Sequence, residues 1–435
     1  KNRTHNCVFY FFMSLTYFFK TAIIETDFII GGAFLVTKRF RVYFFTALFV
    51  LLFAFPAFSA QIVDTGTCGG GGKGENVTWT LYEDGKMEIS GEGDVVVLKT
   101  ASRPWYAYLS DIRTVVIGEG VTSTGKFAFE SCENLTSVTL PRSLKTIDSS
   151  AFAACKSLSM ITIPENVQVI GDYAFAACRN LTTITIPEGV RLIDEFAFCE
   201  CDSLLSMTIP VSVAKIGRSA FSGCDNLSAA TLLYGVETID DFAFYNCQKL
   251  EKINLPVSVT SIGGSVFAEC HSLTSVILPP QITVIDEGAF AHCATLETVV
   301  IPSGVTVIAK FAFDKCKNLR NVYYTGTKAE WESIRVGCGN EYLRQATLHD
   351  SAAVLFPSIV KKSDEAVYTV SAANLPQSSM VVVALYKDGR FVWYESAVYN
   401  GEALDISTQT PHDAATVMAW KALDKLLPLA PAAKI

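Results

Sequence analysis

Apolar residues recur through the middle of the chain with a fixed period of 23 residues. A phenylalanine marks the period, a leucine and a cysteine keep step with it, and nine copies run without insertion or deletion. A strict period of this length is typical of solenoid proteins, in which each repeat adds one coil to a continuous core. The phenylalanines are Phe129, Phe152, Phe175, Phe198, Phe221, Phe244, Phe267, Phe290 and Phe313.

Within one copy the apolar pattern changes from strand-like to turn-like. In residues 181–187, LTTITIP, two isoleucines alternate with threonines, as on a short strand with one buried face. The proline ends the strand, because it has no N–H group for a further ladder bond. Two more apolar anchors follow at Val190 and Ile193, and Asp194 is expected to cap a short helical turn that carries the phenylalanine. Each copy therefore predicts one β/α unit.

Cysteine occupies the same core position in all nine copies, three residues after the phenylalanine. Equivalent side chains of adjacent coils stack at roughly 5 Å, and parallel Cβ vectors at that spacing suit neither disulfides nor a convergent metal site. We therefore expect free thiols that pack as small hydrophobic side chains. Cys68, Cys199 and Cys338 lie outside this row and are candidates for pairing. The row consists of Cys132, Cys155, Cys178, Cys201, Cys224, Cys247, Cys270, Cys293 and Cys316.

The segments on either side of the repeats predict further β-structure. Residues 60–108 contain an alternating hairpin pattern with a DG turn, and we expect them to cover the first repeat. The array itself spans residues 109–349, of which 325–349 contain a short amphipathic helix, KAEWESIRV, that is expected to cover the last repeat. Residues 350–435 lose the period and alternate in short runs around a KDGR hairpin signal, which indicates a small β-sandwich.

The beginning of the chain has the pattern of a targeting region, residues 1–59. In residues 38–60 basic residues precede an apolar stretch that is too short to span a membrane, and small residues then predict cleavage after Ser59. Residues 1–35 hold two interrupted apolar pieces and no initial Met, so we expect a spurious extension with the true start near Val36. The alternative is an additional membrane segment. Contact with a membrane is otherwise expected only through the export signal.

The repeat consensus, L-x-x-I-x-I-P-x-x-V-x-x-I-G/D-x-x-A-F-x-x-C, resembles the BspA-like leucine-rich repeat of bacterial surface proteins. The resemblance covers residues 109 to about 324, and both flanking segments resemble the caps of such proteins. Pattern and resemblance together predict a right-handed β/α leucine-rich-repeat solenoid with an N-terminal β cap and a small C-terminal all-β domain.

The resemblance further implies a function in binding rather than catalysis. It implies a secreted or cell-surface protein that binds other proteins through its solenoid, as an adhesin does with host or matrix protein. The alternative is a glycan- or cell-wall-binding surface protein that acts through the C-terminal β domain.

Candidate catalytic chemistry is sparse in this sequence. A net charge of −8 argues against a nucleic-acid partner, which favours a basic face. His271 and His292 occupy different repeat positions, and no serine, cysteine or carboxylate keeps a triad-like relation to either, so we expect surface loop histidines. The zinc-protease, serine-hydrolase and phosphate-loop motifs are missing from the sequence. We therefore predict no catalytic residue, no metal and no cofactor.

The outward positions of the repeated strand remain as the candidate binding surface, because solenoids commonly bind along it. Threonine also suits any solvated strand, so a run of threonines alone does not show a ligand. The later repeats are more apolar, and we expect Ile277, Val300, Tyr323 and Tyr324 to form an exposed patch for a protein or a glycan. The candidate residues of the whole face are Thr162, Thr183, Thr185, Thr208, Asn254, Ile277, Val300 and Tyr323.

Overall fold

The structure, a computed structural model, describes residues 60–69, 76–97 and 102–350 in full, and the backbone of seven strands between residues 358 and 434. The targeting region 1–59 lies outside the described residues. The expectations of an export signal, of cleavage after Ser59 and of a start near Val36 therefore stay predictions.

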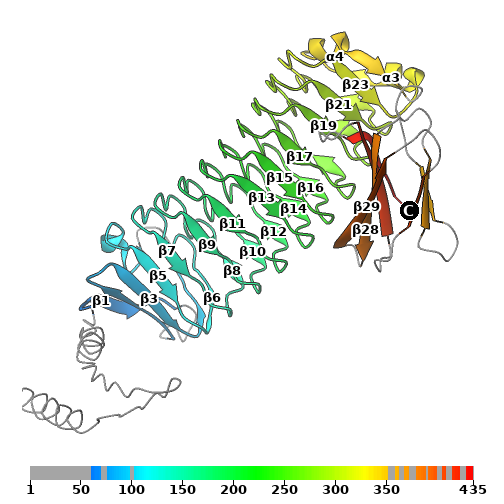
Figure 1. The fold of residues 1–435 in the computed structure, drawn as a ribbon. Coiled ribbons are helices and arrows are strands. Elements are labelled where there is room, and N and C mark those ends of the chain that lie inside the picture. Colours follow the sequence, from blue (N-terminus) through cyan, green and yellow to red (C-terminus); the bar gives the residue numbers. More distant parts are fainter. Residues whose placement is uncertain are drawn as a thin grey trace, which may run out of the picture. The chain divides into compact units, whose positions relative to one another are not determined.

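Each repeat contributes two strands, and equivalent strands of successive repeats lie side by side in two parallel rows (Figure 1). Residues 23 apart face each other, as Ile161 and Ile184 do. The first row contains β5 (Thr114–Ile117), β7 (Ser137–Thr139), β9 (Met160–Thr162), β11 (Thr183–Thr185), β13 (Ser206–Ile209), β15 (Ala229–Leu232), β17 (Lys252–Asn254), β19 (Ser275–Ile277), β21 (Thr298–Ile301) and β23 (Asn321–Tyr324). The second row contains β6 (Val121–Ser123), β8 (Thr146–Ile147), β10 (Val169–Ile170), β12 (Leu192–Ile193), β14 (Lys215–Ile216), β16 (Thr238–Ile239), β18 (Ser261–Ile262), β20 (Val284–Ile285) and β22 (Val307–Ile308).

The segment that carries the core phenylalanine is a series of tight turns, not the helical turn that the sequence predicted. Phe196 and Glu200, two residues before and after Phe198, both have φ of 56°. The Phe198 N–H donates to the Ala220 carbonyl of the next coil at 2.7 Å, whereas an α-helix bonds within its own segment. A left-handed residue at these two positions prevents the helix, so the fold is a β-solenoid with few helices rather than a β/α one. The right-handed sense of the coils stays a prediction.

The helices of the fully described part are short and lie outside the regular coils. They are η2 (Tyr106–Tyr108), α3 (Lys328–Ser333) and α4 (Glu341–Gln345). The helix α3 falls within the predicted KAEWESIRV segment and begins with a capping box, in which Thr327 and Glu330 satisfy each other's backbone N–H groups.

The nine phenylalanines form one continuous stack along the core. Each side chain is fully buried, neighbouring ring centroids lie 5.2–5.7 Å apart, and the ring planes differ by 5–20°. Trp105 extends the stack by lying 5.9 Å from Phe129, and Trp79 meets Trp105 edge-on at 5.7 Å. A stack of this kind fills the coil interior with one large side chain per repeat, which no single repeat can bury alone.

The cysteine row is buried beside this stack and is made of free thiols, as predicted. From Cys155 to Cys316 each thiol also donates a hydrogen bond, at 3.1–3.3 Å, to the carbonyl oxygen of the phenylalanine in the preceding coil. Burial raises the pKa of Cys178 and Cys270 to about 12, so these thiols stay protonated at neutral pH. Cys68, Cys199 and Cys338, the candidates for pairing, are free as well.

Side chains complete the hydrogen bonds of the turn segment where the coils begin. Inside the array, the Ala151 and Ala153 carbonyls accept N–H groups from the coil before them. In the first coil, the equivalent carbonyl of Ala128 accepts the Trp105 indole N–H at 2.7 Å. The carbonyl of Glu130 accepts the Arg103 guanidinium at 2.6 Å.

Where the coils end, one side-chain amide completes the hydrogen bonds of the turn segment. The buried Asn340 side chain accepts the Phe313 N–H at 2.9 Å, in the place of the carbonyl that a further coil would supply. Its NH2 group donates to the Ala309 carbonyl at 2.8 Å and to the Gly337 carbonyl at 3.1 Å. Buried polar groups of the last coil are thereby paired rather than orphaned.

The two rows of strands continue into the flanking segments. On one side β3 (Lys86–Gly91) pairs with β5 in parallel, and β2 (Val77–Tyr82) and β1 (Ile62–Thr67) follow antiparallel, while β4 (Gly93–Asp94) pairs with β6. On the other side β24 (Arg335–Val336) pairs with β22, and β25 (Thr347–His349) pairs with β23.

The strands after residue 357 form two antiparallel sheets. One sheet has the order β26 (Ser358–Lys361), β27 (Val367–Ser371), β30 (Leu404–Ser407). The other has the order β29 (Arg390–Val398), β28 (Ser379–Lys387), β31 (Ala414–Lys421), β32 (Pro428–Lys434). The prediction that residues 350–435 form a β-sandwich stays a prediction.

Two phenylalanines of one coil test the role of the stack. We expect Phe198→Ala to lower the free energy of unfolding by about 3–5 kcal/mol, because it opens a cavity in the core. The matched change Phe196→Ser, at a partly exposed ring of the same coil, should cost about 1 kcal/mol or less. Urea unfolding followed by circular dichroism measures both, and equal losses would contradict the stack as the main stabilising element.

The thiols allow a test by chemical labelling of the chain from Ala60 onward. We expect a maleimide to label exposed Cys338 rapidly, partly buried Cys199 slowly and the buried cysteines only after denaturation. Because burial holds the pKa of Cys178 at about 12, raising the pH from about 7 to about 9 should not release this protection, since the thiolate is the reacting form. Labelling of the row in native protein, counted by mass spectrometry, would contradict the buried ladder.

The amide at the end of the coils can be removed without touching the core. Asn340→Ala leaves the Phe313 N–H and the Ala309 carbonyl buried and unpaired, so we expect a loss of about 2–4 kcal/mol in the last coils. Hydrogen exchange of the Phe313 amide, compared with the Phe198 amide in mid-array, gives the local readout. Equal protection of Phe313 in both proteins would show that Asn340 is not needed.

Candidate functional site

The outward positions of the first strand row form a face without charge over five successive coils. Thr162, Thr183, Thr185 and Thr208 are exposed there, and Thr162 lies opposite Thr185 in the register of β9 and β11. Asn254, on β17, is exposed as well. The structure thus brings these five candidates onto one face, while their role in binding stays a prediction. The uncharged segments are 136–139, 159–162, 182–185, 205–208 and 228–231.

The threonine hydroxyls of this face are open to a partner. Within the fully described residues, the hydroxyls of Thr162, Thr185 and Thr208 make no hydrogen bond to the protein. The neighbouring Thr182, by contrast, donates its hydroxyl to the Ser159 carbonyl at 3.2 Å. The β-sheet backbone beneath the free hydroxyls holds them at fixed spacing, so the face offers donors and acceptors on a rigid support.

In the later coils, the predicted exposed patch of Ile277, Val300, Tyr323 and Tyr324 does not form. Val300 is only 8 % exposed and Tyr324 only 1 %, so neither belongs to an exposed patch. Ile277 and Tyr323 flank Val300 in the strand register and cover it from both sides, and both are themselves half-buried. Tyr323 stacks on His349 at 4.5 Å.

Tyr324 is buried because it occupies an inward position of its strand. It lies opposite Ile301 in the register of β21 and β23. Its ring meets Trp331 edge-on at 5.3 Å, and its hydroxyl donates to the Ser303 carbonyl at 3.3 Å.

The exposed apolar side chains of the face lie in the earlier coils, where the sequence analysis did not place them. Met160 is 63 % exposed in β9, opposite Thr183, and Leu205 is 53 % exposed directly before β13. Charged residues return only at Arg113 on one side and at Glu251 and Lys252 on the other. The signal that could have found this patch is the outward position itself, because Met160 and Leu205 interrupt a run of serine and threonine. We call Met160, Thr162, Thr183, Thr185, Leu205 and Thr208 the strand-face patch.

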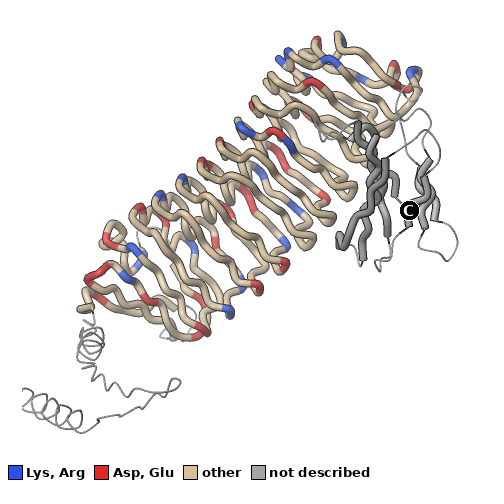
Figure 2. Tube along the Cα trace, viewed as in Figure 1, with Lys and Arg blue, Asp and Glu red and all other residues tan. Residues whose placement is uncertain are grey.

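Elsewhere on the coils, charges of both signs are interspersed (Figure 2). No single-sign surface of the kind that nucleic acid requires runs along the fully described coils. Within the described part of the chain, no helix is long and apolar enough to cross a membrane.

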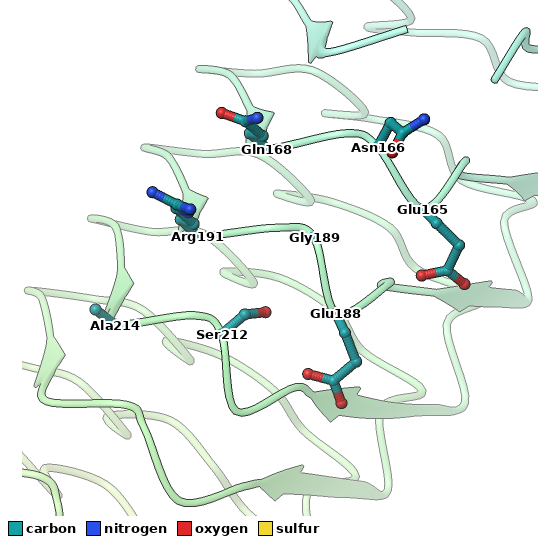
Figure 3. A pocket seen from close by; sticks show the side chains of 8 residues that line it. All are labelled: Glu165, Asn166, Gln168, Glu188, Gly189, Arg191, Ser212 and Ala214. Atoms are coloured by element: carbon teal, nitrogen blue, oxygen red, sulfur yellow. The ribbon is translucent and has the colours of Figure 1, made fainter. Parts of the chain in front are cut away.

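A shallow hollow of about 500 Å³ lies at the turns that follow the first strand row (Figure 3). Two carboxylates from successive coils, Glu165 and Glu188, border it together with Arg191. Gly189 also lines it and lets the two coils approach closely, because a Cβ atom there would come within 2.1 Å of the Glu165 carbonyl oxygen. Its other lining residues are Asn166, Gln168, Ser212 and Ala214. The lining combines charged, amide and hydroxyl side chains and contains no histidine or cysteine, so it offers groups for hydrogen bonds.

The histidines are closer to carboxylates than the sequence indicated. Glu269 lies between both rings, with Oε1 3.1 Å from His292 Nδ1 and Oε2 3.4 Å from His271 Nε2. Asp314 lies 3.8 Å from the other nitrogen of His292. The sequence analysis expected surface histidines without a triad-like partner and did not foresee these carboxylates, which the 23-residue stagger brings from adjacent coils to His292. In the described residues no hydroxyl or thiol is bonded to either ring, and no group of acidic, histidine or cysteine side chains suits a metal ion.

A family model described as the BspA type leucine rich repeat region, with six copies, matches residues 102–228 and 215–333. No curated protein matches the chain.

Several solved structures are similar to the chain. A leucine-rich repeat protein from Eubacterium ventriosum is 21% identical over 69% of this chain and 99% of its own, with a TM-score of 0.37. A leucine rich cell surface protein from Faecalibacterium prausnitzii is 25% identical over 62% of this chain and 98% of its own, with a TM-score of 0.30. The leucine rich repeat protein of T. pallidum is 26% identical over 47% of this chain and 90% of its own, with a TM-score of 0.29.

Proposed function

Because the chain belongs to the BspA-type leucine-rich repeat family, we propose that it is an exported bacterial surface protein that binds another protein through its solenoid. The partner is a host or matrix protein, and the contact is made by the strand-face patch. The role is non-catalytic, because the family's repeats build an extended scaffold rather than a pocket with convergent reactive groups.

The exposure of Met160 and Leu205 on a face without charge is the observation that carries this proposal. The central part of a protein interface is depleted of charged residues and enriched in methionine and aromatic side chains. Exposed apolar side chains that gather on one face, rather than singly, mark such contacts. Thr183 and Thr185 lie on the coil between them and add hydroxyls for hydrogen bonds.

The rigidity of the face also favours binding. Each strand of the first row pairs in register with a neighbouring strand, as β9 does with β11 and β13 with β15. Backbone groups that are already ordered lose little entropy when a partner binds. The patch can therefore hold a partner with a modest area of contact.

We also propose that residues 60–108 and 325–349 act as caps of the solenoid. The contacts of Arg103 and Trp105 with the first coil, and of Asn340 with the last, support this role. Terminal repeats need such cover, because their inner faces and ladder edges would otherwise meet solvent.

The patch can be tested by placing charge on it. In a panel of immobilised matrix proteins and glycans, we expect a chain spanning residues 60–435 to bind a matrix protein. The double variant Met160→Glu/Leu205→Glu should weaken that binding by about tenfold or more, because carboxylates would be desolvated in the contact. Surface plasmon resonance measures the affinity.

A matched variant and a shorter chain separate the alternatives. Val284→Glu puts a single carboxylate on an exposed apolar residue of the second strand row and should leave the affinity unchanged within about twofold. Residues 60–349 alone should bind as well as residues 60–435. Binding of a glycan that is lost on removal of residues 350–435 would instead favour the C-terminal β domain as the binding part.

A further inference from the structure

A second row of equivalent side chains runs along the turn segment, two residues before each core phenylalanine. Ser150 and Ser219 of this row are buried, whereas Tyr173 is exposed. All nine members have φ between 50° and 65°, which bulky side chains rarely adopt. Serine or glycine occupies the position in four coils, so the backbone does not require an aromatic ring there. An aromatic side chain in a strained conformation at a surface indicates a role other than packing. The members are Phe127, Ser150, Tyr173, Phe196, Ser219, Phe242, Ser265, Gly288 and Phe311.

Tyr173 presents one face of its ring to the outside. It stacks on Phe196 with ring centroids 4.6 Å apart and planes 4° from parallel, so Phe196 covers one face. The opposite face is directed toward the preceding coil, where Ser150 has no ring to cover it. The side chain is 43 % exposed as a result.

The chain itself shows what such a face can hold. Phe242 stands in the same relation to Ser219 as Tyr173 does to Ser150. Over Phe242 lies the guanidinium of Arg218, with its carbon 5.5 Å from the ring centroid, a cation–π contact. In the coil before Tyr173, Ser149 takes the position of Arg218. Among the described residues, a cation therefore lies over the Phe242 ring and none over the Tyr173 ring.

The surroundings of Tyr173 complement a cation. Asp172 and Glu195 occupy adjacent positions of neighbouring coils, beside Asp194. Burial, and after it the neighbouring Asp194 carboxylate, raise the pKa of Asp172. In the described residues no lysine or arginine forms an ion pair with any of these three carboxylates. Lys215 interacts electrostatically with Asp194 and Glu195, whereas no cation is among the groups that shift the pKa of Asp172. A positive group beside Tyr173 would therefore be attracted by the Asp172 carboxylate and would relieve its repulsion from Asp194.

We propose that the open face of Tyr173, together with the Asp172 carboxylate, binds an arginine or lysine side chain of a protein partner. This surface lies on the turn segment and not on the strand-face patch, so it is a separate contact that goes beyond the proposed function. Guanidinium and ammonium groups gain most where a ring face and carboxylates are both within reach.

The experiment uses a fluorescein-labelled peptide of alternating glycine and arginine, with glycine–serine and glycine–glutamate peptides as comparisons. We expect saturable anisotropy with the arginine peptide alone. Tyr173→Ser should weaken this binding by about tenfold, while Tyr173→Phe should keep it within about twofold, because only the former removes the ring face. Serine stands at the equivalent place in three other coils, so the variant is expected to fold, and circular dichroism checks this.

A second variant tests the same face by occupying it. Ser149→Arg builds the counterpart of Arg218 beside Tyr173, and it should block the peptide from within the chain. Ser159→Arg adds the same charge at an exposed position before β9 and should leave the affinity unchanged within about twofold. The proposal is overturned if the wild-type protein does not bind the arginine peptide, or if Tyr173→Ser binds it equally well. Displacement of the peptide by a neutral oligosaccharide such as maltohexaose would also overturn it, because the face would then be a sugar platform.

Discussion

Hydrogen bonds between equivalent segments of successive coils are the constraint on which the whole molecule depends. They run through both strand rows and through the turn segment, where Phe198 bonds to Ala220 of the next coil. Because each bond joins equivalent segments of neighbouring copies, a residue inserted in one of these segments would have to bulge out or break the bonds to the next coil. The unbroken period of 23 residues is the sequence counterpart of this constraint. The phenylalanine stack and the cysteine row then follow, since equivalent side chains must lie above one another.

Within each coil, the turn segment combines an unfavourable backbone conformation with favourable burial and hydrogen bonding. A left-handed residue such as Phe196 costs about 1–2 kcal/mol relative to a right-handed one. In return the segment turns sharply enough to direct Phe198 inward and still bonds to the next coil. Cysteine suits the fully buried position three residues after the phenylalanine, because it packs there as a small hydrophobic side chain. Its thiol also donates to a phenylalanine carbonyl, which alanine could not do.

The period, the first strand row, the buried phenylalanines and the free thiols were predictable from sequence, because each follows from repetition and alternation. The absence of a helix at Phe198 was not, since left-handed residues such as Phe196 and Glu200 carry no clear compositional sign. The burial of Val300 also escaped prediction, because it depends on Ile277 and Tyr323 in adjacent coils. The carboxylates near His292 come from two other coils, and only the three-dimensional stagger brings them together. The open face of Tyr173 depends likewise on what a neighbouring coil does not provide.

The side chains at the two ends of the coils have a further consequence. Among the coils, Arg103 and Trp105 form these hydrogen bonds with the first, and Asn340 forms its hydrogen bonds with the last coil and the segment after it. The hydrogen bonds at the two ends therefore do not depend on the number of repeats between them. The number of repeats can therefore change during evolution. Whole 23-residue repeats can be duplicated or lost inside the array, while the residues at both ends keep their hydrogen-bond partners. A solenoid built in this way can change its length without a change of fold.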